Sequence, residues 1–351
     1  MTTTTLTPRR ATVPRTLARR GVGTLVLLLV AVAGAVVLSL TFGSRAVSLD
    51  EVWIGLSSWI TGRLPDELGA LAVQSRIPRT VFAVLAGAAL ALSGALMQAV
   101  TRNPLADPGI LGVNTGAALL VVCGIAFFGI TSPFAYLGLA ALGAAVTAVF
   151  VYIVGSLGAG GSTPIKLALA GAATTAALSS LVSAILLPRQ SAMTDFRFWQ
   201  VGSVGRVDGD TMAVVAPVIV IAAIVGLFSA SSLNALALGD DVAVGLGIRV
   251  GPARIIAAAA GVALCAAVTA VAGPIAFVGL MVPHAVRLLC GPDQRWLLPL
   301  SAAGGAVILV LSDTIGRVLG APGEVDAGII TAFVGAPVLV LIARTTRMRA
   351  L

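Results

Sequence analysis

Charged residues are scarce in this sequence: they make up 10% of its 351 residues, against about a quarter in an ordinary soluble domain. Histidine, lysine and cysteine are scarcer still, with one, one and three copies. A soluble globule needs more charge on its surface than this, and 58% of the residues are hydrophobic, so lipid is the expected solvent. The composition predicts one polytopic membrane domain, although the length alone would suggest two or three soluble domains.

Each scarcity excludes a class of site. The single histidine rules out a histidine-rich metal cluster, and the three cysteines stand singly in apolar segments without a CxxC pair. The nucleotide loop GxxxxGK[ST] needs a glycine before its lysine, but Ile165 precedes the single lysine, Lys166. Neither HExxH nor GxSxG occurs. We therefore expect no catalytic site, no metal and no cofactor bound by this chain; if ATP drives it, a partner ATPase binds ATP and Mg²⁺.

The formal net charge of +8 suggests nucleic acid as a possible partner, but the basic residues lie mostly at the ends of apolar runs. One cluster lies at the N-terminus: Arg9, Arg10, Arg15, Arg19 and Arg20. Beside a membrane span such a cluster usually fixes orientation, so membrane lipid and not nucleic acid is the expected partner. The uncharged run over 21–44 is longer than the hydrophobic part of a typical signal peptide and is expected to be the first spanning helix.

Ten stretches suit a spanning helix, which needs about 20 mostly apolar residues. Six are separate uncharged runs: 21–44, 80–101, 167–188, 211–239, 296–312 and 327–343. The charge-free stretch 108–165 is long enough for two helices, with a turn at FGITSPF (128–134). Gly273-Pro274 divides 255–286 into two shorter helices. The expected fold is an all-α polytopic membrane protein with ten transmembrane helices.

An even number of spans puts both termini on one side. If that side is the cytoplasm, the inner segments hold 14 of the 22 Lys and Arg and carry a net charge of +10, against −2 outside. Cytoplasmic loops carry such an excess of basic residues, so both termini are expected in the cytoplasm. The domains are then a basic tail over 1–20, one transmembrane domain over 21–345 and a cytoplasmic tail over 346–351.

An ATP-independent secondary carrier is the main alternative of another class. Ion-coupled carriers place Asp, Glu or His in mid-membrane, whereas every acid here is expected at or near the end of a span, with Asp313 reaching furthest in. The carrier interpretation therefore lacks the charged residue in mid-membrane that such a carrier uses.

Residues 102–108 are expected to be a tight inner turn, because Asn103-Pro104 ends one helix and Asp107-Pro108 begins the next.

Two blocks of the sequence resemble a known family. RIPRTVFAVLAGAALALSGALMQAVTRNPLADPGILGVNTGA (76–117) and GPIAFVGLMVPHAVRLL (273–289), followed by LSDTIGRVLGAPGEVDAGIITAFVGAPVLVLI (311–342), resemble the FecCD-type permease subunits of ABC importers for iron–siderophore complexes and cobalamin. The resemblance implies a type II ABC importer permease fold, with ten helices and both termini in the cytoplasm. It also implies three partners: cytoplasmic ABC ATPase subunits, an extracytoplasmic substrate-binding protein and a second permease chain.

The resemblance assigns ATPase coupling to the inner loop ALALGDDVAVGLGIRVGPAR (235–254). The residues concerned are Asp240, Asp241, Val242, Gly245, Leu246 and Gly247. The two aspartates are expected to cap a short helix that runs through Gly247 and presents Val242 and Leu246 as apolar contacts. The glycine at 245 is expected to weaken its last turn. A plain connecting loop is the alternative.

The resemblance assigns docking of the binding protein to Arg76 and Arg79, expected before the second span, and to Arg317, expected after the ninth. Guanidinium binds carboxylates through two hydrogen bonds, which suits this role. The alternative is that these arginines only anchor helix ends at the headgroups.

The pathway is expected along LALAGAATTAALSSLVSAIL (167–186), with an inner gate near GAGGSTP (158–164). Packing between helices is the equal alternative for these residues. The pathway and gate residues are Thr163, Thr174, Thr175, Ser179, Ser180 and Ser183.

The sequence thus predicts the permease subunit of an ATP-driven importer, with ferric siderophores as the expected substrate and localisation in the bacterial cell membrane. A cobalamin or haem importer is the alternative within this class.

Overall fold

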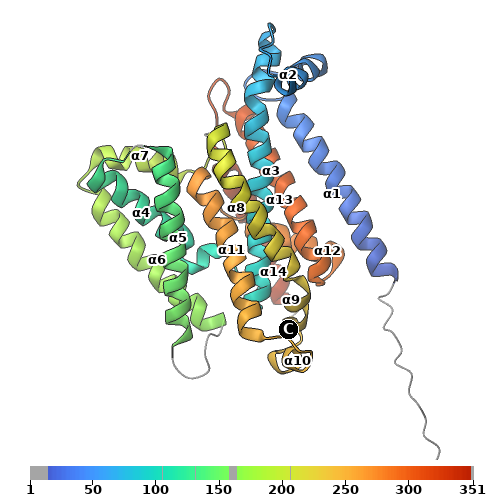
Figure 1. Ribbon diagram of the computed structural model, residues 1–351, viewed down its shortest axis with the longest axis vertical. Helices are drawn as coiled ribbons and strands as arrows, with labels where there is room; N and C mark the ends of the chain where they lie inside the picture. The colour runs from blue at the N-terminus through green and yellow to red at the C-terminus, as the bar shows by residue number, and fades with distance from the viewer. Residues whose placement is uncertain (1–14, 105, 131, 158–163, 206, 349–351) are drawn as a thin grey trace, which may run out of the picture.

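The computed structural model describes residues 15–104, 106–130, 132–157, 164–205 and 207–348, and their regular structure is helical throughout (Figure 1). The elements are α1 (Arg15–Thr41), α2 (Leu49–Thr61), α3 (Leu68–Thr101), the 3-10 helix η1 (Pro108–Leu111), α4 (Val113–Phe128), α5 (Pro133–Ser156), α6 (Pro164–Leu186), α7 (Gln190–Gln200), α8 (Gly209–Phe228), α9 (Ala230–Ala237), α10 (Asp240–Gly245), α11 (Val250–Ala272), α12 (Val278–Cys290), α13 (Gln294–Leu319) and α14 (Ala327–Met348).

Seven of the described helices are long and apolar enough to cross a membrane: α1, α3, α5, α6, α8, α11 and α13. Three shorter apolar helices accompany them: α4, α12 and α14. Each of the ten stretches expected from the sequence covers one of these helices, and 211–239 also takes in the short helix α9, so the all-α polytopic fold is confirmed. The count of ten complete spans stays a prediction.

Local sequence sets where several helices begin and end. α2 begins after Ser48, whose hydroxyl accepts a hydrogen bond from the backbone N–H of Glu51, while the Glu51 carboxylate accepts one from the Ser48 N–H. α2 ends at Gly62, whose φ of 69° is left-handed, a conformation that glycine adopts without steric cost. α3 ends before Asn103-Pro104 as expected, because a residue before proline disfavours the helical conformation.

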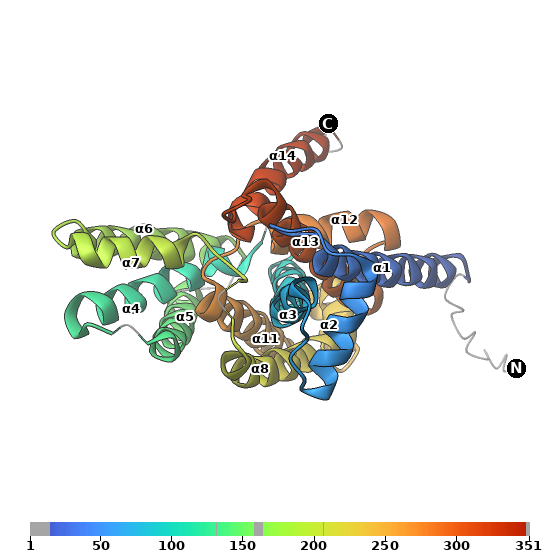
Figure 2. The same cartoon turned by 90° about the horizontal axis from the view of Figure 1, so that it is seen from above.

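α3 is the central helix of the bundle, with α13 and α11 packed along it (Figures 1 and 2). Its closest approaches are made by glycine. Gly87 of α3 meets the backbone of Gly305 in α13, and Gly94 meets the backbone of Gly279 in α12, with no room for a Cβ at these contacts. Small residues let helices approach closely in lipid, where no hydrophobic effect drives them together. These contacts hold α12 and α13 directly against α3.

α4, α5, α6 and α7 form a lobe on one side of the bundle, which we call the wing (Figures 1 and 2). α11 lies between the wing and the rest, because it packs on both α5 and α3. The wing exposes large apolar side chains, among them Leu142, Phe150 and Leu181. Such contiguous apolar surface is expected where helices face lipid or another membrane subunit.

Two helices begin deep inside the bundle. Gly279, near the start of α12, lies against Gly94 and the Leu90 carbonyl of α3, which are about 10 and 16 Å from the end of that helix at 1.5 Å per residue. Asp107 reaches the same point, since one of its carboxylate oxygens lies beside Gly279. Gly112, before α4, lies against Thr147 in the interior of α5. Both short helices therefore begin near mid-depth.

The expected inner turn over 102–108 is therefore only partly right. The chain leaves α3 at Arg102 as expected, but it then turns back into the bundle and does not stay at its end. Asp107 accordingly lies deeper than the sequence predicts. Its carboxylate has a partner there, because Oδ1 accepts a hydrogen bond from the Gly109 backbone N–H at 2.8 Å.

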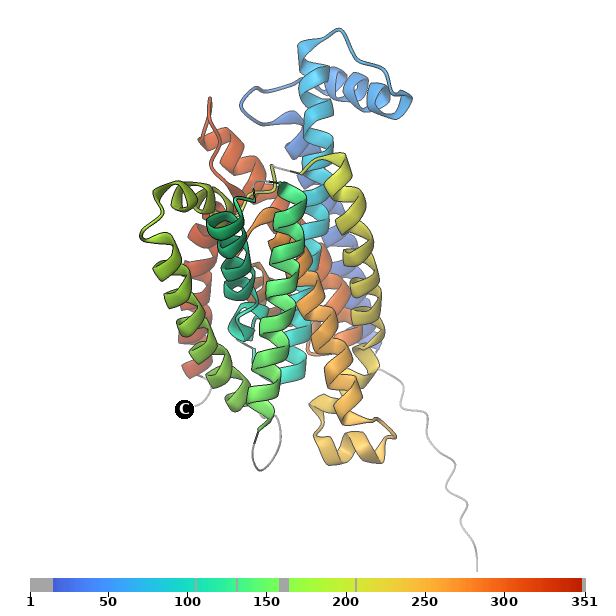
Figure 3. The same ribbon diagram turned by 60° about the vertical axis from the view of Figure 1, so that its left-hand side comes forward.

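α1 begins and α14 ends at the end of the molecule where α10 lies, and α2 lies at the opposite end (Figures 1 and 3). The start of α1 and the end of α14 therefore lie on the same side of the bundle. That this side is cytoplasmic stays a prediction.

Candidate functional site: an arginine cluster, a coupling helix and the wing

The three predicted docking arginines lie inside helices, not beside them. Arg76 and Arg79 belong to α3, which begins at Leu68, and Arg317 belongs to α13, which continues to Leu319. The expected positions before and after the spans are wrong, because a helix need not end at a charge that is paired within the bundle. All three side chains are largely buried: Arg76 and Arg317 are 7% and 3% exposed, and the Arg79 side chain 12%.

Two of these arginines bind the end of α1. Arg76 donates to the carbonyl oxygens of Leu40 at 2.8 Å and Arg45 at 2.6 Å. Arg317 donates to the carbonyl of Ser39 at 3.1 Å and to its hydroxyl at 2.7 Å. The last carbonyls of a helix lack intrahelical partners and carry partial negative charge. The two guanidinium groups therefore cap α1 and tie it to α3 and α13.

The third arginine pairs with acids. Arg79 Nε and Nη2 lie 2.9 and 2.7 Å from Asp313 Oδ1, and Nη1 lies 2.6 Å from Glu324 Oε2. Asp313 is buried and also lies 3.0 Å from Arg317 Nε. We call Arg76, Arg79, Arg317, Asp313 and Glu324 the arginine cluster. Docking by its arginines stays a prediction, and it requires carboxylates of a partner to replace or join these intramolecular ones.

The predicted coupling loop over 235–254 holds the last residues of α9, all of α10 and the first residues of α11, at the opposite end of the molecule. α10 begins after Gly239, with no side-chain cap, and it ends at Gly245. The expectation that Asp240 and Asp241 cap a helix through Gly247 is therefore wrong: both lie in the first turn, and Gly247 follows the helix with a φ of 82°. A left-handed residue of this kind ends the helix and turns the chain toward α11.

α10 presents apolar side chains to its surroundings as expected. Val242 is 47% and Leu246 is 61% exposed, and Val244, which the sequence interpretation missed, is 63% exposed. Asp240 has a different role from capping. Its Oδ1 is bound by Arg102 and, at 2.9 Å, by Arg254 Nη2, so one carboxylate ties α10 to the end of α3 and to α11.

The predicted pathway residues divide into two groups. Thr174 and Thr175 are half-buried and lie against Gly112, before α4, so they contribute to packing of the wing. The hydroxyls of Ser179, Ser180 and Ser183 lie on the exposed side of α6. Thr163 and the remainder of the predicted gate over 158–163 lie outside the described residues. Of the five predicted hydroxyl residues that the structure describes, three are thus exposed on α6, and the hydroxyl of Ser180 donates to the Ala176 carbonyl at 2.9 Å.

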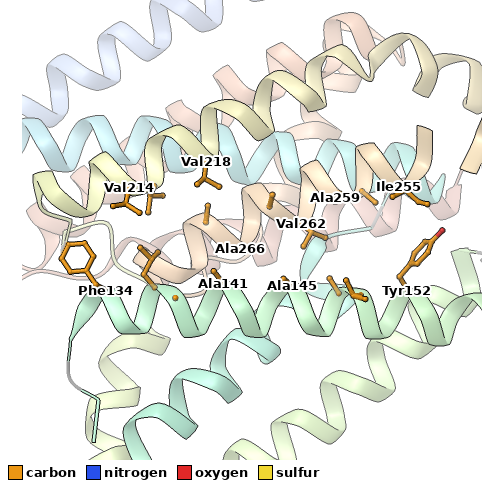
Figure 4. A pocket seen from close by; sticks show the side chains of 18 residues that line it. Phe134, Ala141, Ala145, Tyr152, Val214, Val218, Ile255, Ala259, Val262 and Ala266 are labelled. Carbon is orange, nitrogen blue, oxygen red and sulfur yellow. The ribbon is translucent and has the colours of Figure 1, made fainter. Parts of the chain in front are cut away.

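A groove of about 780 Å³ lies between α5, α8 and α11 (Figure 4). Alanine and valine dominate its lining, with Phe134 and Tyr152 toward its two ends. Its walls come from apolar faces of spanning helices and include no hydroxyl of the predicted pathway. The groove is therefore separate from the predicted pathway residues.

Comparison with known proteins agrees with this geometry. The model of the FecCD transport family matches residues 27–345. The chain is 42% identical to the ferric enterobactin transport system permease protein FepD of Escherichia coli, over 93% of this chain and 95% of that protein. It is 45% identical to the siderophore transport system permease protein YfiZ of Bacillus subtilis (77% and 81% covered) and 34% identical to the hemin transport system permease protein HmuU of Yersinia pestis (85% and 88% covered).

A solved structure is also similar. An ABC transporter of metal-chelate type in an inward-facing conformation superimposes with a TM-score of 0.77 at 27% identity, over 93% of this chain and 99% of that chain. PsaBC of Streptococcus pneumoniae, at 18% identity and a TM-score of 0.58, shares the fold. The family model covers most of this chain, and relatives above 30% identity cover more than two thirds of it, so this multi-pass protein of the bacterial cell membrane belongs to the FecCD transport family of ABC importer permeases.

Proposed function

We propose that this chain forms the translocation pathway of an ABC importer for ferric siderophores. The observation that carries the proposal is the 42% identity to the ferric enterobactin permease over nearly the full length of both chains. Relatives named for a siderophore, for ferric citrate and for ferric hydroxamates lie at 38–45% identity. The chemistry they share is a chelated ferric ion, which is substrate here and not a resident cofactor.

In this proposal separate ATPase subunits bind ATP and Mg²⁺ and act on this chain through α10. Two features support α10 as their contact. Its exposed apolar side chains lie at the end of the bundle where α1 begins and α14 ends (Figure 1), and Asp240 links it to α3 and α11. A displacement of α10 is therefore passed directly to two spanning helices.

The pathway itself is proposed to lie between two permease chains, one of them this chain. The exposed hydroxyls of α6 support this arrangement, since they offer weak hydrogen bonds on an otherwise apolar surface. A second permease chain, identical or related, would cover this face. We expect Ser179→Trp to block uptake by occupying the pathway, while Val149→Trp, on the groove of Figure 4, leaves uptake unchanged.

Haem is the second candidate substrate. The specific observation that favours it is the 34% identity to the hemin permease over 85% of this chain. Identity to siderophore permeases is higher over similar or greater lengths, so we place ferric siderophores first.

The test is uptake of radiolabelled iron by iron-starved cells with and without this gene. The iron is supplied separately as a catecholate, a hydroxamate and a citrate chelate, and as haem. We expect loss of uptake of at least one siderophore in the deletion strain and its recovery with the wild-type gene. Loss of haem uptake alone would replace ferric siderophores with haem as the proposed substrate. Unchanged uptake of all four iron sources would reject ferric siderophores as the substrate.

The arginine cluster is proposed to lie in the surface that receives the binding protein. Its place at the end opposite α10 supports this (Figure 1), and so does Glu324, which is 46% exposed on the side chain and is bound to Arg79. Charge reversal of Arg76 and Arg317 together should abolish binding-protein affinity and transport. Because both also cap α1, the melting temperature must be recorded on the same samples; unchanged affinity in a folded variant would refute docking.

A further inference from the structure

Asp107 is an acidic residue inside the bundle that the proposed transport mechanism does not yet use. It is half-buried between the end of α3 and the start of η1. Its Oδ1 accepts a hydrogen bond from the Gly109 N–H at 2.8 Å. Its Oδ2 lies 2.7 Å from the point where a Cβ on Gly279 would be. One carboxylate therefore contacts both η1 and α12.

Both contacts are with the first residues of a helix. The first N–H groups of a helix have no intrahelical acceptor, and they give this end a partial positive charge. Gly279 is the second residue of α12, and Gly109 is the second residue of η1, which leads directly into α4. In a medium of low dielectric a carboxylate between two such ends attracts both.

Glycine at 279 makes this contact possible. A Cβ there would also approach the Leu90 carbonyl at 3.1 Å and the Gly94 Cα at 3.3 Å. The carboxylate of Asp107 thus occupies the space that a side chain of α12 would otherwise fill. The meeting of α3, α12 and Asp107 at one point depends on this missing side chain.

Side chains of Gln98, Arg287 and Thr269 satisfy other polar atoms around this point. Gln98 donates from Nε2 to the Gly279 carbonyl at 3.2 Å; that carbonyl would normally accept from residue 283, but Pro283 has no N–H. The Gln98 oxygen accepts from Arg287 Nη2 at 2.9 Å. On the α11 side, Asn114 Oδ1 accepts from Thr269 Oγ1 at 3.1 Å.

The contact lies at the junction of two parts of the molecule. η1 packs on α4, α5 and α6 of the wing, whereas α12 packs on α3, α13 and α14. Figure 2 shows these two groups on different sides of α11. The backbone contact between Asp107 and Gly109 belongs to the wing, and the contact with Gly279 belongs to the other part.

We propose that Asp107 is a positioning residue for transport, whose carboxylate holds the start of η1, which leads into α4, against the start of α12 near mid-depth of the bundle and so fixes the wing relative to α3, α12 and α13. An acid at this depth is costly and is retained where it has a function. The effect on transport rests on the proposed function, whereas the effect on the position of the wing does not.

The first experiment compares Asp107→Asn with Asp210→Asn, an exposed acid at the start of α8. Asparagine keeps the size and the hydrogen-bond acceptor but removes the charge. With the complete transporter, we expect at least tenfold slower uptake for Asp107→Asn at an unchanged melting temperature, and less than twofold change for Asp210→Asn. Wild-type uptake by Asp107→Asn would overturn the proposal.

The second experiment measures the position of the wing. Spin labels are placed at Leu181 on α6 and Val340 on α14, both about half exposed, in a variant without the native cysteines. We expect Asp107→Asn to broaden or shift the distance distribution, and an unchanged distribution would overturn the proposal. If wild-type protein takes up no ferric siderophore, the proposed function fails, but this measurement still decides the role of Asp107.

The third experiment approaches the same contact from α12, and it also serves if Asp107→Asn does not fold. Gly279→Ala adds a methyl group where the Asp107 carboxylate lies. We expect at least tenfold slower uptake in the wild-type background. In the Asp107→Ala background we expect a clearly smaller further loss, because the carboxylate is gone and only the tight contacts with the Leu90 carbonyl and the Gly94 Cα remain. Independent effects that multiply in the double variant would overturn the proposal.

Discussion

At the scale of single residues, Arg79 and Asp313 form a buried ion pair. Asp313 is 1% exposed and is bound by two nitrogens of Arg79. Asp313 also lies 3.0 Å from Arg317 Nε, so it keeps one cationic partner when Arg79 is removed. We expect Arg79→Ala to lower the stability of the purified permease by about 1.5–3 kcal/mol, the contribution of hydrogen bonds to a charged group, measured by thermal unfolding in detergent.

Glu324→Gln provides the matched control for this prediction. Its carboxylate binds the same arginine, but its side chain is 46% exposed, and exposed ion pairs contribute about 1 kcal/mol or less. The control should therefore melt close to the wild type. Equal melting temperatures for Arg79→Ala and the wild type would show that the buried pair is not a stabilising element.

The sequence identified these arginines but not their environment. Charge at the end of an apolar run is usually solvated, so the positions of Arg76, Arg79 and Arg317 predicted a surface role. Their burial depends on carbonyls at the end of α1 and on Asp313, more than 200 residues away from Arg79. Partners so distant in the chain leave no local pattern.

At the scale of elements, the contact between α3 and α13 depends on glycine at Gly87 and Gly305. A Cβ on Gly305 would collide with the Gly87 carbonyl and with the side chain of Ala91. Backbone cannot yield as a flexible side chain can, so the two helices must separate. We expect Gly305→Ala to destabilise the purified protein by about 1–3 kcal/mol, as overpacking does, when it is measured by thermal unfolding.

Gly34→Ala in α1 is the control for this contact. It is exposed, and nothing lies within 4 Å of its Cβ position. Alanine favours helix by about 1 kcal/mol over glycine, so this variant should be as stable as the wild type or slightly more stable. A similar loss in both variants would mean that the close approach of α3 and α13 has no special effect.

The elements also show how far the sequence alone could go. Apolar runs and proline–glycine breaks located every spanning-length helix, the turn at 128–134 and the division at Gly273-Pro274. They did not reveal that 102–107 turns back into the bundle. A proline- and glycine-rich interruption of an apolar run has the same composition whether the chain then leaves the membrane or re-enters it. The direction is set by contacts of Asp107 and Gly112 with distant helices.

At the scale of the whole molecule, the two ends of the bundle have different surfaces. The end with α2 holds the arginine cluster, and the opposite end holds the start of α1, the end of α14 and the apolar side chains of α10 (Figures 1 and 3). A transporter driven by a cytoplasmic ATPase and supplied by an extracytoplasmic binding protein needs two such different surfaces. The arrangement therefore predicts which partner is lost when either end is altered.

Placing a charge on α10 should release the ATPase without unfolding this chain. Val244 and Leu246 are exposed and touch no core, so glutamate at either position is tolerated in the isolated permease. In the assembled transporter the same carboxylate would be buried against an apolar partner surface, where losing a central contact costs about 2–4 kcal/mol. We expect Leu246→Glu to reduce co-purification of the ATPase more than tenfold. Ile60→Glu on α2, also exposed but at the opposite end, should retain the ATPase fully, and equal retention by both variants would place the ATPase contact elsewhere.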